Sequence, residues 1–543
     1  MAENFKFNSS APALHVPALD RLGLVRTLDW SIIGTLALLI VFGFGLRVTQ
    51  LGAIGFAEDE MNKLDAIHAY ERGDFSANSE HPMVMKVLMW ASVSTAPVDS
   101  LEAALRLPNA LIGALTVVPL FLLTLAFFDR RTALLASAFW AFGINAITHN
   151  RIGKEDTLLV FFMLFAFFFF VRAKQISPAD IPGRARRYAA SAVSFGLMIA
   201  SKYFPHYLGL NMLFHHNFHA REARVNEPSG HTPGWFFIVI VGVFLVASPA
   251  VLMPEVWQYM NAYTSERLLT HSGYLFAGQL YKNNMSSSPF WGTPIYFYLL
   301  FFAIKVPIVT LLAFVVGLLI AIRQPRRLGH AFLLFMFLFW LVPYSLIGGK
   351  WLRYTLSVMP FVYMLAAVGV VGLVRWATAR FSNSRRAGAV VFAAAVVLFV
   401  CVPAWTAFAN RPHYALYTNA FGAGNAGYFF PHDEFYDDGL REALKFVCEQ
   451  APPGATIAHE TPGVVRHYLY LFDRTDLNSQ VISAKEFDVA SVTGAPGTVY
   501  VIAQRGRTYF ENRDELEAVR AKFRKIHEVN IGGASAVEVF INR

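Results

Sequence analysis

The dominant pattern along the chain is a series of long apolar runs separated by short polar connections. Crossing a hydrocarbon layer of about 30 Å takes about 20 mostly apolar residues in a helix. Runs that qualify lie at 29–49, 107–128, 132–148, 156–171, 234–253, 297–322, 330–347, 354–374 and 388–408. The sequence therefore predicts an α-helical polytopic membrane protein.

One further apolar stretch, 188–214, is interrupted by Ser201-Lys202-Tyr203-Phe204-Pro205. A charge and a proline inside a single span are unfavourable, because hydrocarbon leaves charged and unpaired backbone groups unsolvated. We predict two short spans here with a polar break at the outer face, which brings the total to about 11 transmembrane helices.

Residues 410–543 have the composition of a soluble domain. They contain 14 basic and 17 acidic residues, whereas the preceding 409 residues hold the other 32 basic and 20 acidic residues. The patterns predict a helix over 437–450, strands at 456–458 and 498–503, a helix over 511–525 and a hairpin over 526–541. We expect a small α/β domain, which either recognises an acceptor or serves as a passive stabilising cap.

The basic residues of the membrane part predict its orientation. With the N-terminus in the cytoplasm, the inner connections hold 19 of the 32 Lys and Arg residues, as the positive-inside rule requires. We therefore predict a cytoplasmic segment 1–28, a membrane domain 29–409 and an extracytoplasmic domain 410–543. The expected location is the inner or cell membrane of a bacterium or archaeon.

The overall composition excludes several classes of protein. Hydrophobic residues make up 55% of the chain and charged residues 15%, and there are only two cysteines. These values exclude disordered, collagen-like and disulfide-stapled proteins. The net charge of +9 arises from the inner connections, so we expect the lipid bilayer and not nucleic acid as a partner.

Acidic residues stand at two places where the predicted outer loops meet the membrane. The first outer loop, 50–105, opens with Glu58-Asp59-Glu60, and Asp156 precedes the fourth apolar run. Unpaired charge at this boundary is costly unless it has a partner or a task. Both groups would also suit the start of a helix, so a capping role and a catalytic role remain open.

Cations also gather at the predicted outer ends of the spans, where the positive-inside rule disfavours them. Any one of them could extend to the lipid headgroups, but the set as a whole favours an anion site. Lys and Arg bind phosphate well, and a lipid could deliver it. The cations are Lys86, Arg106, Arg151, Lys154, Lys202, Lys350 and Arg353, with Lys305 inside a span.

The order of these groups resembles the GT-C superfamily of integral-membrane glycosyltransferases that use polyprenyl-phosphate sugars. The likeness is strongest to the protein O-mannosyltransferase and aminoarabinose lipid A transferase group, and it covers residues 27–410. One element departs from the pattern, because His81-Pro82-Met83-Val84-Met85-Lys86 lacks a second proline. The matching elements are Asp59-Glu60, Arg106-Leu107-Pro108, Ser201-Lys202-Tyr203, Ile304-Lys305-Val306-Pro307 and Arg353-Tyr354.

The resemblance implies transfer of a sugar from a polyprenyl-phosphate donor to an acceptor hydroxyl with inversion at the anomeric carbon. The acceptor would be Ser or Thr of a protein, or a surface glycolipid. A carboxylate must take the proton of the hydroxyl, and we assign this to Asp59, with Glu60 and Asp156 in support. Fixed cations would stabilise the leaving phosphate: Arg106, Lys202 and Arg353 first, then Lys86 and Arg151.

Other residues have less defined roles. Glu80 and His81 offer oxygen and nitrogen ligands, so a divalent metal is open, although a structural His81 is the simpler interpretation. Glu80, His81 and Lys305 are expected to support the acceptor or the structure. The aromatic-rich outer loop 254–296 is either an interfacial belt or a lid over the site.

A transporter or flippase of lipid-linked sugars is the alternative function, since intramembrane charge would be expected there as well. The long acidic first outer loop, the odd number of spans and the lack of an internal repeat favour the enzyme.

Overall fold

A computed structural model describes residues 29–177, 179–219, 232–265, 272–284, 292–381, 385–484, 487–493 and 497–542. The predicted cytoplasmic segment 1–28 lies outside these residues. So do 266–271 and 285–291, which belong to the predicted outer loop 254–296.

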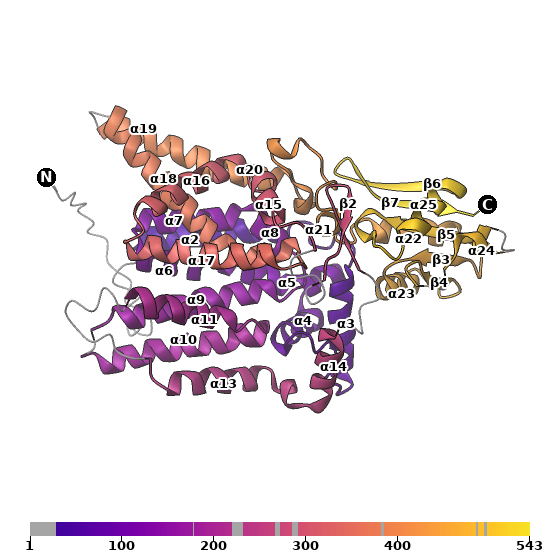
Figure 1. The fold of residues 1–543 in the computed structure, drawn as a ribbon, viewed down its shortest axis with the longest axis horizontal. Helices are drawn as coiled ribbons and strands as arrows, with labels where there is room; N and C mark the ends of the chain where they lie inside the picture. The colour runs from indigo at the N-terminus through magenta and orange to yellow at the C-terminus, as the bar shows by residue number, and fades with distance from the viewer. Residues whose placement is uncertain are drawn as a thin grey trace.

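Long apolar helices lie side by side and make up the larger part of the molecule (Figure 1). Helix α10 packs against α9 and α13, and α18 packs against α16 and α7. The helices of this part are α2 (Trp30–Val48), α5 (Leu101–Leu115), α6 (Val117–Phe127), α7 (Arg130–Phe142), α9 (Asp156–Gln175), α10 (Ile181–Ser201), α11 (His206–Phe214), α13 (Trp235–Ala247), α15 (Phe297–Lys305), α16 (Ile308–Arg323), α17 (Leu328–Leu346), α18 (Met359–Phe381), α19 (Arg385–Val396) and α20 (Val402–Ala409).

Within the described residues, six helical segments are long and apolar enough to cross a membrane. These are Trp30–Val48, Leu101–Phe127, Asp156–Gln175, Leu328–Leu346, Met359–Arg380 and Arg386–Ala409. The protein is thus an integral membrane protein, as predicted, while the total of about 11 spans stays a prediction.

Prolines account for the breaks that shorten other apolar runs. The predicted break in 188–214 is confirmed, because α10 ends at Ser201 and α11 begins at His206, directly after Pro205. The run 297–322, predicted as one helix, is broken between α15 and α16 at Val306-Pro307. Proline has no N–H to donate to the preceding turn, so the helix ends before it.

Short elements collect at the end of the bundle that faces the C-terminal sheet (Figure 1). They come from segments far apart in the sequence, and they supply the candidate site described below. They are α3 (Glu58–Glu71), α4 (Met83–Thr95), α8 (Ile144–Asn150), α14 (Pro254–Thr264), β1 (Tyr274–Phe276), β2 (Gln279–Tyr281), η4 (Leu352–Ser357) and α21 (Pro431–Phe435).

The C-terminal part contains a five-stranded sheet in the order β4-β3-β5-β7-β6. Strands β4, β3 and β5 are parallel, whereas β7 pairs antiparallel with β5 and β6. The elements are α22 (Leu440–Gln450), β3 (Thr456–His459), α23 (Pro462–Leu471), β4 (Asn478–Val481), α24 (Val489–Thr493), β5 (Val499–Gln504), η8 (Arg505–Arg507), α25 (Arg513–Lys522), β6 (Arg524–Ile531) and β7 (Ala534–Ile541).

All five elements predicted for this part are present, while α23 and β4 were not predicted. The expected helix over 437–450 begins only at Leu440, because Tyr436, Asp437 and Gly439 all have positive φ angles. One apolar core joins this part to the bundle: Phe56, Met61 and Met85 share it with residues of α22 and α23.

Candidate active site

The acidic triplet Glu58-Asp59-Glu60 forms the first turn of α3. Negative charge is favourable there, because the free backbone N–H groups of a helix start carry partial positive charge. The Glu60 carboxylate also accepts a hydrogen bond from the N–H of Ala57 (3.1 Å). The capping role that the sequence left open is therefore present, but it accounts for only part of what the three carboxylates do.

Asp59 is the centre of a convergent set of donors. Its Oδ2 atom forms ion pairs with Lys154 Nζ and with Arg353 Nη1 (3.1 Å), and it accepts a hydrogen bond from the Tyr436 hydroxyl. Among the described residues, no group donates to Oδ1. The side chain keeps 30% of its surface exposed, so one carboxylate oxygen is held in place and the other is open.

The charges around Asp59 determine its ionisation. Burial alone would raise the pKa of its carboxyl group, but Lys154 and Arg353 outweigh burial and hold the pKa well below its usual value. Asp59 is therefore ionised at neutral pH. Burial in turn lowers the pKa of Lys154 to about 8, with Arg353 contributing in the same direction.

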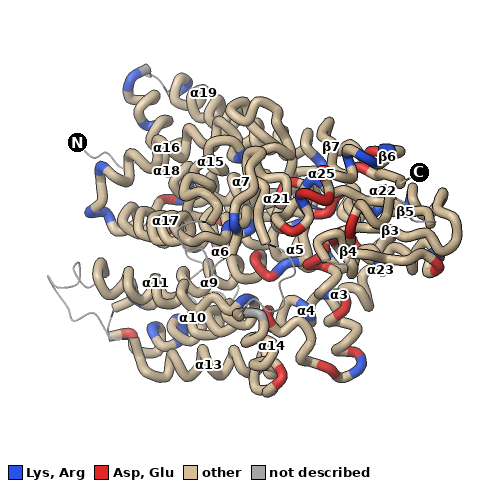
Figure 2. The backbone as a smooth tube through the Cα atoms, turned by 45° about the vertical axis from the view of Figure 1, so that its right-hand side comes forward, with Lys and Arg blue, Asp and Glu red and all other residues tan. Residues whose placement is uncertain are grey.

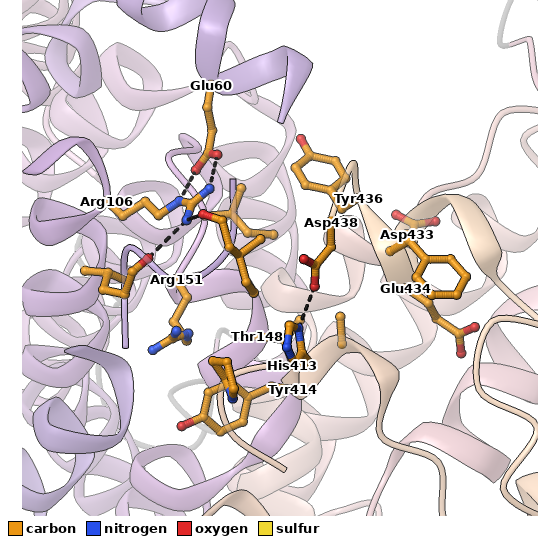
Figure 3. Close-up of a pocket in the computed structure, with 16 residues that line it drawn as sticks. Glu60, Arg106, Thr148, Arg151, His413, Tyr414, Asp433, Glu434, Tyr436 and Asp438 are labelled. Atoms are coloured by element: carbon orange, nitrogen blue, oxygen red, sulfur yellow. Dashed lines mark hydrogen bonds and ion pairs between the residues drawn. The ribbon is translucent and has the colours of Figure 1, made fainter. Parts of the chain in front are cut away.

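Glu60 forms a buried pair with Arg106 (Figure 3). Arg106 Nε donates to Oε1 (2.8 Å) and Nη2 donates to Oε2 (2.6 Å). The remaining guanidinium N–H groups bond the carbonyls of Leu51, Ile54 and Gly55. All five donors of Arg106 are thus engaged within the protein.

Asp156 begins α9 and pairs with Lys202 in the break between α10 and α11 (2.6 Å). Its Oδ2 atom is buried and finds no hydrogen-bond partner among the residues that the structure describes. The ammonium group of Lys202 also lies over the rings of Phe204 and Tyr354, at 4.5 and 5.2 Å from their centroids. Asp156 therefore holds Lys202 beside the η4 segment that carries Arg353.

Three residues of this site received no role from the sequence, namely Lys63, Glu155 and Tyr436, whereas Lys154 was predicted only as one of the cations of an anion site. Lys63 and Glu155 form a fully buried pair (2.9 Å), and His81 Nδ1 lies 3.7 Å from the same carboxylate. Lys154 and Glu155 directly precede Asp156, so their position was a usable signal. No local signal pointed to Tyr436, because the residue that it contacts, Asp59, lies 377 positions away in the sequence.

Three other predicted cations bind carbonyl groups of the protein. Lys86 donates hydrogen bonds to the backbone carbonyls of Ala77, Asn78 and His81 and thereby stabilises the loop before α4. Arg151 donates to the carbonyls of Arg47, Thr49 and Gln50 at the end of α2. Lys305 donates to the carbonyl of Ala415 (2.7 Å) and also pairs with Glu434 (2.7 Å). The Glu80 carboxylate accepts a hydrogen bond from the Asn78 side chain.

Cavities lie between the bundle and the segment 412–438. One is lined by His149, Lys154, Asp156, Arg353, Asp433 and Tyr436, directly beside Asp59. In Figure 3, Glu60, Arg106 and Arg151 line a neighbouring pocket from the bundle, opposite Tyr436 and Asp438 of the C-terminal part. Within the described part of the chain, no group of three His, Cys, Asp or Glu residues could hold a metal ion.

Comparisons with known proteins give one family and several related folds. Residues 80–253 match the family model for dolichyl-phosphate-mannose-protein mannosyltransferase. No curated protein sequence matches the chain. Among solved structures, the Archaeoglobus fulgidus oligosaccharyltransferase tethered with an acceptor peptide is similar at a TM-score of 0.50 and 13% identity, over 94% of this chain and 74% of that chain.

Two further structures are similar at lower scores. ArnT from Cupriavidus metallidurans bound to undecaprenyl phosphate gives a TM-score of 0.48 at 13% identity, over 94% of this chain and 98% of that chain. The archaeal oligosaccharyltransferase AglB in complex with an inhibitory peptide and a dolichol-phosphate gives 0.47 at 12% identity, over 94% and 74%. The match to the family model over residues 80–253 and the similar fold at a TM-score of 0.50 support the resemblance to the GT-C superfamily that the sequence indicates, and the chain is an integral membrane protein.

Proposed function

We propose that the protein is an inverting glycosyltransferase that moves a sugar from a polyprenyl-phosphate donor to an acceptor hydroxyl at the outer face of the membrane. The observation that supports this proposal most is the state of Asp59. Its carboxylate is ionised, lies beside a cluster of cations and has one oxygen without a donor among the described residues. The family model matched by residues 80–253 supports a lipid-phosphate mannose donor. The acceptor would be a protein Ser or Thr, or a surface glycolipid.

Exposure distinguishes Asp59 from three other carboxylates at this end of the bundle. The Asp59 side chain is 30% exposed, against 1% for Glu60, 0% for Glu155 and 6% for Asp156. Glu58 is also exposed, at 37%, but its carboxylate pairs with Arg507. A general base must come within hydrogen-bond distance of the proton that it removes. We therefore assign the base to Asp59 and give Glu60 and Asp156 positioning roles through Arg106 and Lys202.

The leaving phosphate needs cations that a substrate can reach. Arg353 is 22% exposed and lines the cavity together with Lys154. Lys202 pairs with Asp156, which lines the same cavity. We assign the donor phosphate to Arg353, Lys202 and Lys154. Arg106, Arg151 and Lys86, which the sequence also suggested, use their N–H groups on protein acceptors, so we propose structural roles for them.

The proposed step needs no covalent intermediate. The acceptor oxygen attacks the anomeric carbon and loses its proton to Asp59 Oδ1. The bond from that carbon to the phosphate oxygen breaks, and the electron pair leaves with the polyprenyl phosphate. Because the cations lie where negative charge develops, they stabilise the transition state more than the ground state.

The orientation belongs to the same proposal. Figure 2 shows Lys and Arg at the ends of the helices remote from the C-terminal sheet, while Asp and Glu lie mainly nearer the sheet, together with further Lys and Arg. The cations at the remote ends support a cytoplasmic N-terminus, and with it a location of the first outer loop, 50–105, and of the C-terminal part, 410–543, outside the cytoplasm.

Purified protein in proteoliposomes can separate this function from the transporter alternative. The probe is polyprenyl-phosphate mannose labelled in the sugar, added together with a Ser- and Thr-containing peptide or a glycolipid. A glycosyltransferase releases polyprenyl phosphate and labels the acceptor. Movement of the intact lipid between leaflets, with no label on any acceptor, would contradict the proposal and favour the transporter.

A further inference from the structure

The segment that follows α21 holds two neighbouring residues in a costly backbone conformation. Tyr436 has a φ angle of 45° and Asp437 one of 65°, and Gly439 follows at 88°. For residues other than glycine, the left-handed region is sterically unfavourable, and it persists where surrounding contacts enforce it. Such a pair therefore calls for contacts that hold it in place.

Those contacts come from both parts of the molecule and converge on Asp437. Arg507 Nε donates to its Oδ1 atom (2.6 Å), and Gln504 Nε2 donates to the same oxygen (3.0 Å). The backbone N–H of Glu58 donates to Oδ2 (2.9 Å), while Arg507 Nη1 pairs with the Glu58 carboxylate (2.6 Å). The turn is thus fastened to β5 and η8 on one side and to the first residue of α3 on the other.

This attachment places consecutive residues of the two segments against each other. The backbone N–H of Glu58 donates to Asp437, and the next residue of α3, Asp59, accepts a hydrogen bond from the hydroxyl group of Tyr436. Tyr436 lines both the cavity beside Asp59 and the neighbouring pocket, and Figure 3 shows it in the second of these. The strained turn therefore orients a side chain of the C-terminal part into the reaction centre.

We propose that Tyr436 is a positioning residue of the transfer reaction, whose hydroxyl group fixes the Asp59 carboxylate so that Oδ1 faces the acceptor. The inference rests on the proposed function. Lys154 supplies a compact charge on a flexible stem to Oδ2, and Arg353 directs only its Nη1 to the same oxygen. A phenol on a rigid ring sets the plane of the carboxylate, and in the transfer step Tyr436 keeps its own proton.

The C-terminal part is then more than the passive cap that the sequence left open. It lines the cavity beside Asp59 through Asp433 and Tyr436, and it supplies the Tyr436 hydroxyl group to the base. Misplacement of a base by about 1 Å can lower a rate by about 100-fold, so a positioning bond has a measurable effect on turnover.

The test is Tyr436→Phe in the full-length protein, compared with Tyr470→Phe, which alters a ring that is 78% exposed on α23. Activity is measured with polyprenyl-phosphate mannose and a saturating acceptor. We expect kcat to fall by about 10- to 100-fold with the donor KM unchanged, as for a lost hydrogen bond to a charged group. The acid limb of the pH profile should also move to higher pH, because the carboxylate loses a donor that favours its charged form.

Each other outcome overturns the inference. An unchanged kcat with an unchanged acid limb would show that the hydroxyl does not position Asp59. Failure of Tyr436→Phe to fold, seen as a collapsed melting transition, would show that the hydroxyl is structural. If the wild-type protein transfers no sugar, it is the proposed function that fails, so the two failures are distinguishable.

Discussion

At the scale of single residues, the same chemical group serves different purposes depending on what surrounds it. Glu60 and Glu155 are buried and paired one to one with Arg106 and Lys63, whereas Asp59 is partly exposed and meets several donors on one oxygen. A sequence presents these carboxylates as equivalent. Only the fold separates the one that a substrate can reach from those that hold the site together.

Lys154→Met should shift the pH dependence of transfer. Burial alone would raise the pKa of Asp59, but three cations, Lys154, Arg353 and Lys63, keep it below its usual value, and Lys154 contributes most. Without the ammonium group this pKa rises, so the carboxylate is protonated, and activity is lost, at a higher pH than in the wild type. The measurement is kcat/KM from pH 4 to 8, and an acid limb that stays in place would contradict the assignment.

Arg106→Lys tests whether Arg106 is structural. Lysine keeps the charge but offers three donors in place of five, so it leaves Glu60 and the loop carbonyls incompletely satisfied. We expect a loss of about 3–5 kcal/mol in the free energy of unfolding, as for a broken buried pair. Thermal unfolding in detergent measures it. Unaltered stability combined with a raised donor KM would restore the phosphate-binding role.

At the scale of elements, breaks in the apolar helices carry the polar chemistry. The break after Ser201 presents Lys202 to Asp156, and the break before Pro307 presents Lys305 to Glu434. The prolines that cause these breaks are visible in the sequence. Their partners are not, because they depend on which loops meet at the end of the bundle.

Lys305→Met should weaken the attachment of the C-terminal part to the bundle. The change leaves the Glu434 carboxylate buried without its cation, at a cost of about 3–5 kcal/mol. Lys282→Met, at an exposed position, is the matched control. Limited proteolysis should cleave the variant around residues 410–440 faster than the control. Equal cleavage of the two variants would show that the ion pair contributes nothing to this attachment.

At the scale of the whole molecule, charge and hydropathy predicted the layout, and long-range contacts decided the site. Apolar runs and the change in charge density located the helical bundle, and local patterns gave five elements of the C-terminal part. The contact of Tyr436 with Asp59 joins residues 377 positions apart, and that of Arg507 with Glu58 joins residues 449 apart. No local pattern in the sequence encodes such pairs.

The proposed orientation can be tested by labelling single cysteines in a chain without Cys401 and Cys448. One substitution is Tyr470→Cys, at an exposed position of α23, and the other is Arg326→Cys, in the connection between α16 and α17. With intact cells and a membrane-impermeant maleimide, Cys at 470 should be labelled and Cys at 326 should not. The reverse pattern would invert the proposed topology.

The central claim is that Asp59 is the base for sugar transfer, and Asp59→Asn tests it most directly. The control is Asp99→Asn, at an exposed position of the same loop. For Asp59→Asn the account predicts that polyprenyl-phosphate mannose still binds while transfer falls by about 100- to 10,000-fold, as for loss of a general base. Full transfer activity in Asp59→Asn would contradict it.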